Sequence, residues 1–515
     1  MRLSLFSLTL VSLISSRPSF GQNAADTEKA LDHFRCGMGY VQSNKLRSAI
    51  NEFRLAIEAD PRQQMAYVEL AASFRKRDQN DHAKEVLMKC VDINPSSEEA
   101  NFQLGSMLED DGDTTAALRH YEQCLRTDHA HAKAHFGAAR LYFEQKRFEE
   151  SMRAFETAYR FSERLDRQDH FEICMILGVN AAQPLNRVPF PDRPLDVKDL
   201  HHILIARRVR PYCSAVYGFR ILGPEILVPL FNRPDLSEYI ASHRKKAILY
   251  LREAIRIDPK SPRGYLELAE LYLSSYVLED NRNYIALARN ELEMAEKNSV
   301  VQGVSKHLAR ALFLLGVLDM ADGKHAESIT RLQRADRVMY FRMFLAPGLI
   351  WDELIPLYIG FCFEQLGEFE KAVEFYRRAS ERQFNYPAPY VRLGLIFLGR
   401  GDTEGALREL KTGEFLGRQT RDPIEIGHLL WLISNVYSKQ GNRLEAIKYA
   451  VEATKEAKRD VPEFLSFLAQ LYQDDGQSES ALKTLDKAIG SETDPEELRR
   501  MKTLRDEWSG RPRQK

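Results

Sequence analysis

The chain has 515 residues, of which 44% are hydrophobic and 29% are charged, and its formal net charge at pH 7 is -1. This length exceeds what one compact hydrophobic core ordinarily holds, so we expect several domains or an extended repeat array. The balanced charge provides no electrostatic attraction for a polyanion, which excludes nucleic acid from the expected partners.

The first 21 residues have the composition of a Sec-type signal peptide. Arg2 supplies the positive charge, Leu3 to Ile14 form a short apolar run, and Ser19 and Gly21 are small residues at the positions that a signal peptidase reads. The apolar run is shorter than the roughly 20 residues of a membrane-spanning helix, which disfavours an anchor. We therefore predict cleavage before Gln22, export to the periplasm or the cell exterior, and a mature chain without a transmembrane segment.

A 34-residue period follows. Blocks that begin at Ala30, Gln64, Glu98 and Ala132 share small residues near the eighth and twentieth places and large ones at the eleventh and twenty-fourth; in the first block these are Gly37, Ala49, Tyr40 and Phe53. The small residues let two antiparallel helices approach closely, and the large ones fill the space to the next pair. One pair cannot bury its apolar face alone, so the pairs must stack. We predict four repeats over residues 26–163.

The period is lost over residues 164–245. Eight prolines fall between Pro184 and Pro234, a density that interrupts helices, and arginines gather around Arg207 and Arg208. We interpret this stretch as a degenerate repeat and Pro-rich linker. The alternative is a specialised insert that carries a partner site.

The period returns over residues 246–495, where we predict about six further repeats. Their paired small positions include Leu315-Gly316, Ile359-Gly360 and Leu393-Gly394. Residues 496–515 are predicted to form a capping helix and a tail, because Asp494-Pro495 is a typical helix start and apolar residues follow on one side. A terminal repeat needs such a cover.

The skeleton of these blocks closely resembles the tetratricopeptide repeat. The resemblance implies an all-α, right-handed superhelical solenoid of about ten helix-turn-helix repeats with a Pro-rich interruption. It also implies a concave groove, lined by the first helix of each repeat, that binds protein or peptide partners. Some members hold chaperone C-termini with a clamp of lysine, asparagine and arginine. Here apolar residues occupy those places in the first repeat, so we expect no clamp: Leu31, Phe34, Met38 and Val41.

In the second array the same register assigns eight apolar residues to the groove, which we predict as the partner-binding site: Phe313, Val317, Met320, Leu357, Phe361, Val391, Leu395 and Leu398. A contiguous apolar face above a few hundred Å² usually marks an interaction site. The competing interpretation is that the insert, or the closure of the solenoid itself, covers these side chains.

Two patterns with potential chemistry favour packing instead. His131 and His135 have the spacing of two metal ligands on one helix face, but His135 occupies a place where packing needs a large ring. Cys90 and Cys124 occupy the same place in consecutive repeats, about 8–10 Å apart, which is farther than a disulfide permits. We therefore predict no catalytic residue, no metal site and no cofactor.

These observations predict an exported, non-catalytic scaffold that organises an envelope or secretion-related complex through its groove. The alternative is an enzyme or cofactor-binding protein whose site lies within residues 164–245. Converging carboxylates or histidines in that stretch would favour the alternative.

Overall fold

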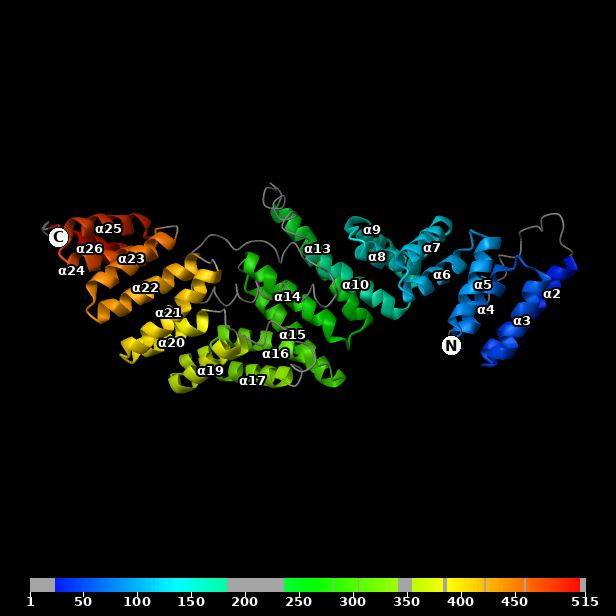
Figure 1. Ribbon diagram of the computed structural model, residues 1–515, viewed down its shortest axis with the longest axis horizontal. Coiled ribbons are helices and arrows are strands. Elements are labelled where there is room, and N and C mark those ends of the chain that lie inside the picture. Colours follow the sequence, from blue (N-terminus) through cyan, green and yellow to red (C-terminus); the bar gives the residue numbers. More distant parts are fainter. Residues whose placement is uncertain are drawn as a thin grey trace. The chain divides into compact units, whose positions relative to one another are not determined.

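The computed structural model describes residues 24–182, 236–279, 281–303, 305–340, 354–382, 387–420, 423–457 and 460–509. Every regular element in these ranges is helical, with 23 α-helices and one short 3-10 helix, which confirms the predicted all-α class (Figure 1). The predicted signal peptide and most of the Pro-rich stretch lie outside the described residues.

The helices fall into two compact units, the first running from α2 to α10 with α13 and the second from α14 to α26. The elements of unit 1 are α2 (Ala24–Gln42), α3 (Leu46–Ala59), α4 (Gln64–Arg75), α5 (Asn80–Ile93), α6 (Glu98–Asp110), α7 (Thr114–Thr127), α8 (Ala132–Glu144), α9 (Phe148–Arg160), η2 (Ser162–Arg164), α10 (Arg167–Ala182) and α13 (Leu236–Ile257).

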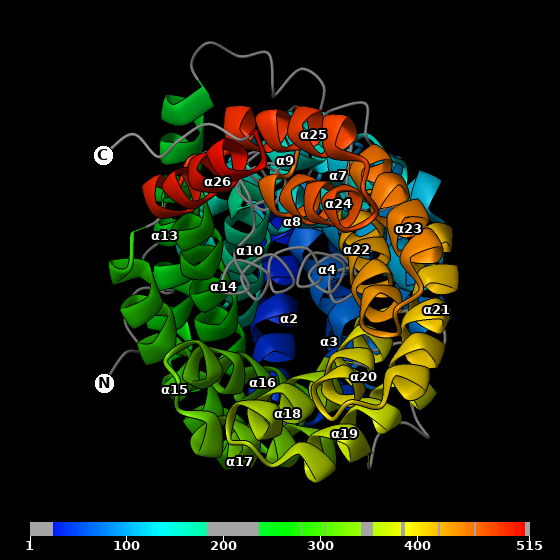
Figure 2. The same cartoon turned by 90° about the vertical axis from the view of Figure 1, so that its left-hand side faces the viewer.

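The elements of unit 2 are α14 (Pro262–Glu279), α15 (Asn283–Gln302), α16 (Ser305–Ala321), α17 (His325–Tyr340), α18 (Leu354–Gln365), α19 (Phe369–Arg382), α20 (Ala388–Gly399), α21 (Thr403–Thr420), α22 (Pro423–Lys439), α23 (Arg443–Glu456), α24 (Pro462–Asp474), α25 (Ser478–Ser491) and α26 (Pro495–Trp508). In this unit the first helix of each pair lies on the inner side of the curve and the second on the outer side (Figure 2).

A close approach at one glycine position joins the two helices of a pair. A Cβ atom added to Gly105 would lie 2.9 Å from the ring of Tyr121, so only glycine leaves room for the ring. Six pairs share this contact: Gly37 with Phe53, Gly105 with Tyr121, Gly178 with Leu251, Gly316 with Leu332, Gly360 with Tyr376, and Gly394 with Leu410. They are the eighth and twenty-fourth places of the repeat.

The contact between Gly178 and Leu251 makes α10 and α13 one repeat, although 73 residues separate them instead of 16. Arg167 also donates to the carbonyl oxygen of Ile257 (2.7 Å). The sequence period identified only the second half of this repeat, because α10 is buried on nearly all sides and shows no amphipathic period. The described residues thus form eleven pairs, and the long insertion begins and ends between the two helices of the fifth.

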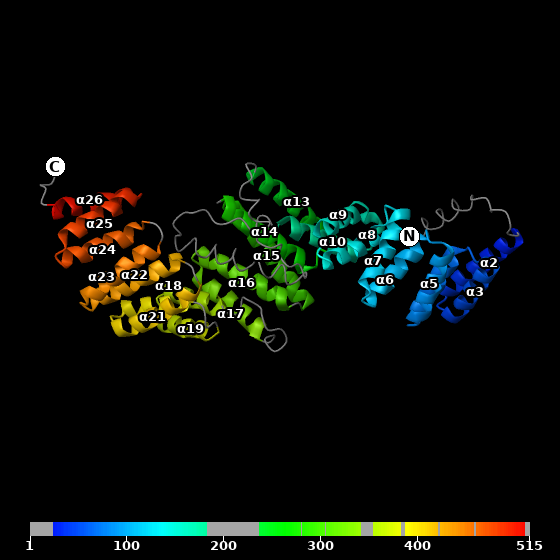
Figure 3. The same ribbon diagram turned by 45° about the horizontal axis from the view of Figure 1, so that its top comes forward.

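The last helix, α26, covers the apolar side of the final pair (Figure 3). The Asp494 carboxylate caps it by accepting from the backbone N–H groups of Glu496 and Glu497. Met501 is buried against the cluster that contains Leu465 and Leu485. This cover keeps the end of the array from exposing its core.

Candidate partner-binding surface

The eight predicted groove residues lie on three consecutive first helices, α16, α18 and α20, but they differ in exposure. Phe313, Val317, Met320 and Leu357 are buried, with exposed fractions of 1%, 1%, 3% and 7%. Phe361, Val391, Leu395 and Leu398 are partly exposed. Only the second group can contact a partner without a local opening of the helices.

The buried group lies next to a cluster of buried charges. Arg310 of α16 donates through Nη1 to Glu267 of α14 (3.0 Å) and also pairs with Glu270. All three residues are at most 8% exposed, and the ring of Phe313 lies 5.8 Å from that of Tyr358. The first helices at this end of unit 2 are therefore packed as core.

The partly exposed apolar residues continue beyond the predicted set onto α22 and α24. Trp431 stacks on Phe464 with a centroid distance of 5.8 Å and meets Phe467 edge-on at 6.2 Å. Trp431 and Phe467 are both partly exposed. We call the combined set the inner apolar strip: Phe361, Val391, Leu395, Leu398, Trp431 and Phe467.

Sequence reasoning missed the α22 and α24 part of this strip. Trp431 occupies the fifth place of its repeat, as Val391 does in the preceding one. Extending the register by one repeat would have found it.

A neutralised charge pair lies within the strip. The Arg392 guanidinium is 5.0 Å from the ring centroid of Phe361, and its Nη1 donates to Glu364 (3.3 Å). The other oxygen of Glu364 accepts from the Tyr376 hydroxyl (2.5 Å). Burial, assisted by the Glu364 carboxylate, raises the pKa of Tyr376, so the hydroxyl remains a donor at physiological pH.

Unit 1 contains the same polar arrangement without the strip. The Tyr121 hydroxyl donates to Glu109 (2.7 Å), which also pairs with Arg140 (2.7 Å), and the Arg140 guanidinium lies 5.1 Å from the Phe136 ring. The corresponding places on α6 include Glu99, Ser106 and Glu109, which are polar. The extended apolar strip is therefore a property of unit 2.

The histidines considered as metal ligands have other roles. His131 caps α8, where its Nδ1 accepts from the backbone N–H of Ala134 (3.1 Å), and Nε2 of His135 lies 3.0 Å from the carbonyl oxygen of His129. No group of three or more His, Cys, Asp or Glu residues suited to a metal occurs within the described ranges. Cys90 and Cys124 are free and buried.

No helix in the described part of the chain combines the length and the apolar character needed to cross a membrane.

Three stretches match models of the tetratricopeptide repeat: residues 66–97, 108–158 and 359–386. The type IV pilus assembly protein PilF of Pseudomonas aeruginosa is 24% identical over 130 residues, which make up 25% of this chain and 52% of that protein. The chain thus spans about half the length of this curated relative.

Among solved structures, the APC/C hetero-tetramer Cut9-Hcn1 aligns over 97% of this chain and 99% of its own, with a TM-score of 0.39 and 13% identity. Yeast Tom70 aligns over 94% and 96%, with a TM-score of 0.38 and 13% identity. Both scores lie below 0.5, so the family assignment depends on the repeat matches instead. These matches lie in both units, on helix pairs built like their neighbours, and the chain is therefore a tetratricopeptide-repeat protein.

Proposed function

We propose that this chain is a non-catalytic scaffold that binds a protein or peptide partner along the inner apolar strip of unit 2. The observation that supports this most strongly is the strip itself. Four successive first helices, α18 to α24, present partly exposed apolar side chains on the inner side of the curve. Apolar surface left accessible in a folded chain is costly unless another surface covers it.

The chemistry of the strip fits the apolar side of an amphipathic segment. Its aromatic members Phe361, Trp431 and Phe467 offer large flat surfaces, which dominate the free energy of many protein interfaces. The guanidinium of Arg392 is already paired with Glu364. A partner therefore needs no matching charge at this point, and shape and apolar area would provide most of its affinity.

The N-terminal segment and one relative support a place of action. A Sec-type leader predicts that the mature chain works in the periplasm or outside the cell. The similarity to a protein named for type IV pilus assembly supports an envelope or secretion-related complex. We propose this setting for the scaffold.

Peptide selection tests the binding surface directly. Peptides selected from a displayed random library against the full chain are expected to be amphipathic and to compete with one another for one site. Replacing Leu395 and Leu398 together by Ser should weaken their binding about tenfold or more, because losing a central apolar contact costs about 2 kcal/mol.

Phe415 and Leu444 provide the matched control, since they are exposed apolar residues on second helices, at 66% and 77%. Replacing both by Ser should leave the affinity unchanged. Circular dichroism must show equal helix content in all three proteins. If the Leu395 and Leu398 variant binds as tightly as the original chain, the strip is not the binding surface.

A further inference from the structure

Arginine–carboxylate pairs link successive second helices along the outer side of unit 2. Four consecutive junctions carry one, with these closest N···O distances: Glu296–Arg334 between α15 and α17 (2.5 Å), Asp336–Arg382 between α17 and α19 (2.7 Å), Arg377–Glu409 between α19 and α21 (2.6 Å), and Arg418–Glu452 between α21 and α23 (2.6 Å). Each pair therefore joins one repeat to the next.

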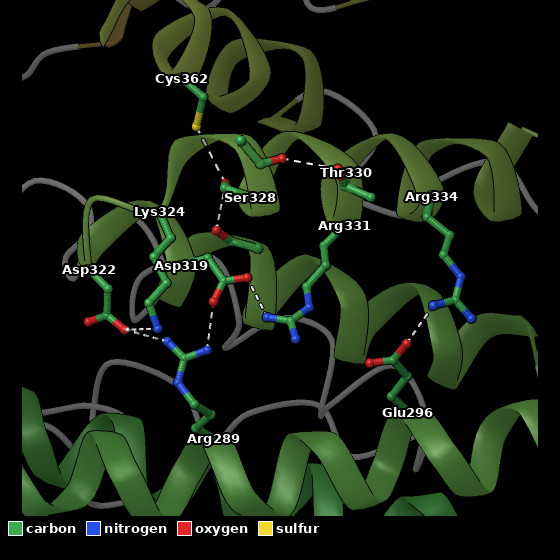
Figure 4. Close-up of polar contacts among 12 residues, drawn as sticks. Arg289, Glu296, Asp319, Asp322, Lys324, Ser328, Thr330, Arg331, Arg334 and Cys362 are labelled. Carbon is green, nitrogen blue, oxygen red and sulfur yellow. Dashed lines mark hydrogen bonds and ion pairs between the residues drawn. The ribbon is translucent and has the colours of Figure 1, made fainter. Parts of the chain in front are cut away.

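The first junction is reinforced by a buried carboxylate. Asp319 stands at the eleventh place of its repeat, where the next two repeats have Phe363 and Phe397, and it is 2% exposed. It accepts from Arg289 of α15 (2.7 Å) and pairs with Arg331 of α17 (Figure 4). A second bond from Arg289 reaches Asp322 (2.7 Å). Replacing the usual ring by aspartate converts this packing position into an ionic link between repeats.

These pairs have more favourable geometry than ordinary surface pairs. The side chains of Glu409 and Asp336 are only 10% and 14% exposed, and Arg377 donates two bonds to Glu409, at 2.6 and 3.2 Å. Paired guanidinium and carboxylate groups fix direction as well as distance. Partial burial reduces screening, and the arginine ends remain accessible to salt.

The described second helices of unit 1 are joined differently. No ion pair runs directly from α3 to α5, from α5 to α7 or from α7 to α9 within these helices. Here the pairs that cross repeats use residues of the connecting segments, as in Lys84–Asp111 and Arg164–Asp128. The direct link from helix to helix is a feature of unit 2.

We infer that the outer pairs act as an ionic brace that sets the spacing of the second helices, and with it the curvature of the inner side of unit 2. In a stacked array the inner and outer spacings are coupled, because each repeat contacts only its neighbours. Screening or removing the pairs lets neighbouring repeats separate and open more often. Unit 2 is thereby an ionic-strength-sensitive element, whether or not a partner is bound.

Hydrogen exchange of the full chain at low salt and at about 1 M NaCl tests this inference, because the Debye length falls from about 10 Å at 0.1 M to about 3 Å at 1 M. Amides of α17, α19 and α21 should exchange about two- to five-fold faster at high salt, in proportion to the weight of such pairs. Amides of α3 and α5 should change less.

Variants locate the effect. Arg377→Gln should accelerate exchange in α19 and α21 at low salt and remove most of their response to salt. The Arg377→Glu and Glu409→Arg exchange of charges should restore slow exchange at low salt. Arg418→Gln provides the same test at a more exposed junction, in case Arg377→Gln fails to fold. The matched control is Arg256→Gln, because Arg256 pairs with Glu253 within α13 and crosses no junction.

Two results would overturn the brace. One is exchange in α17 to α21 that rises with salt no more than exchange in α3 and α5. The other is an Arg377→Gln or Arg418→Gln protein that folds and keeps the full salt response at its junction.

Discussion

The ring of Tyr376 lies so close to Gly360 that a methyl group on this glycine would stand 2.8 Å from the ring. The two residues join α18 to α19, and the Tyr376 hydroxyl then bonds Glu364 near the end of α18. One side chain thus fixes both the spacing of the pair and the polar arrangement within the inner apolar strip.

Gly360→Ala is therefore expected to destabilise the chain by about 1–3 kcal/mol, because neither the ring nor the backbone can move away freely. Urea unfolding followed by circular dichroism measures this change. Gly39→Ala in α2 is the matched control, since nothing lies within 4 Å of its added methyl group. That variant should be neutral or up to about 1 kcal/mol more stable, because alanine favours a helix. Equal effects of the two variants would contradict the close approach.

The cysteines should differ in reactivity. Burial raises the pKa of Cys124 and of Cys174 to about 12 and that of Cys362 to about 11, so these thiols stay protonated and unreactive at pH 8. Cys36 is exposed. Iodoacetamide should label Cys36 in the folded chain well before these three, and urea should remove the difference. Labelling of Cys362 as fast as Cys36, measured by mass spectrometry of peptides, would show that the pair is open.

Export should leave a defined new end. The chain purified from its native host is expected to begin at Gln22, because a signal peptidase reads the small residues Ser19 and Gly21. N-terminal sequencing measures this. A cytoplasmic product that keeps Met1 would refute the export prediction.

The repeated helix pairs could be predicted because each one depends on spacing alone, as between Gly360 and Tyr376. α10 could not, because a helix buried on nearly all sides has no period and its partner lies beyond the insertion. The exposure of the groove positions was equally hidden. Phe313 and Phe361 occupy comparable register positions, yet only Phe313 lies on a helix packed against α14, where Arg310 meets Glu267. Burial there depends on the neighbouring helix, and the register of one repeat does not contain it.

Site-specific photo-crosslinking in the native host tests the central claim most directly. A photoreactive phenylalanine analogue is placed at Leu398 in the inner apolar strip or at Leu444 on the outer side, and peptides selected for the strip are added as competitors to lysed cells. Partner binding along the strip predicts a discrete adduct from position 398 that the competitors suppress, and none from position 444. An adduct that forms equally at both positions, or that persists at 398 in the presence of the competitors, would contradict it.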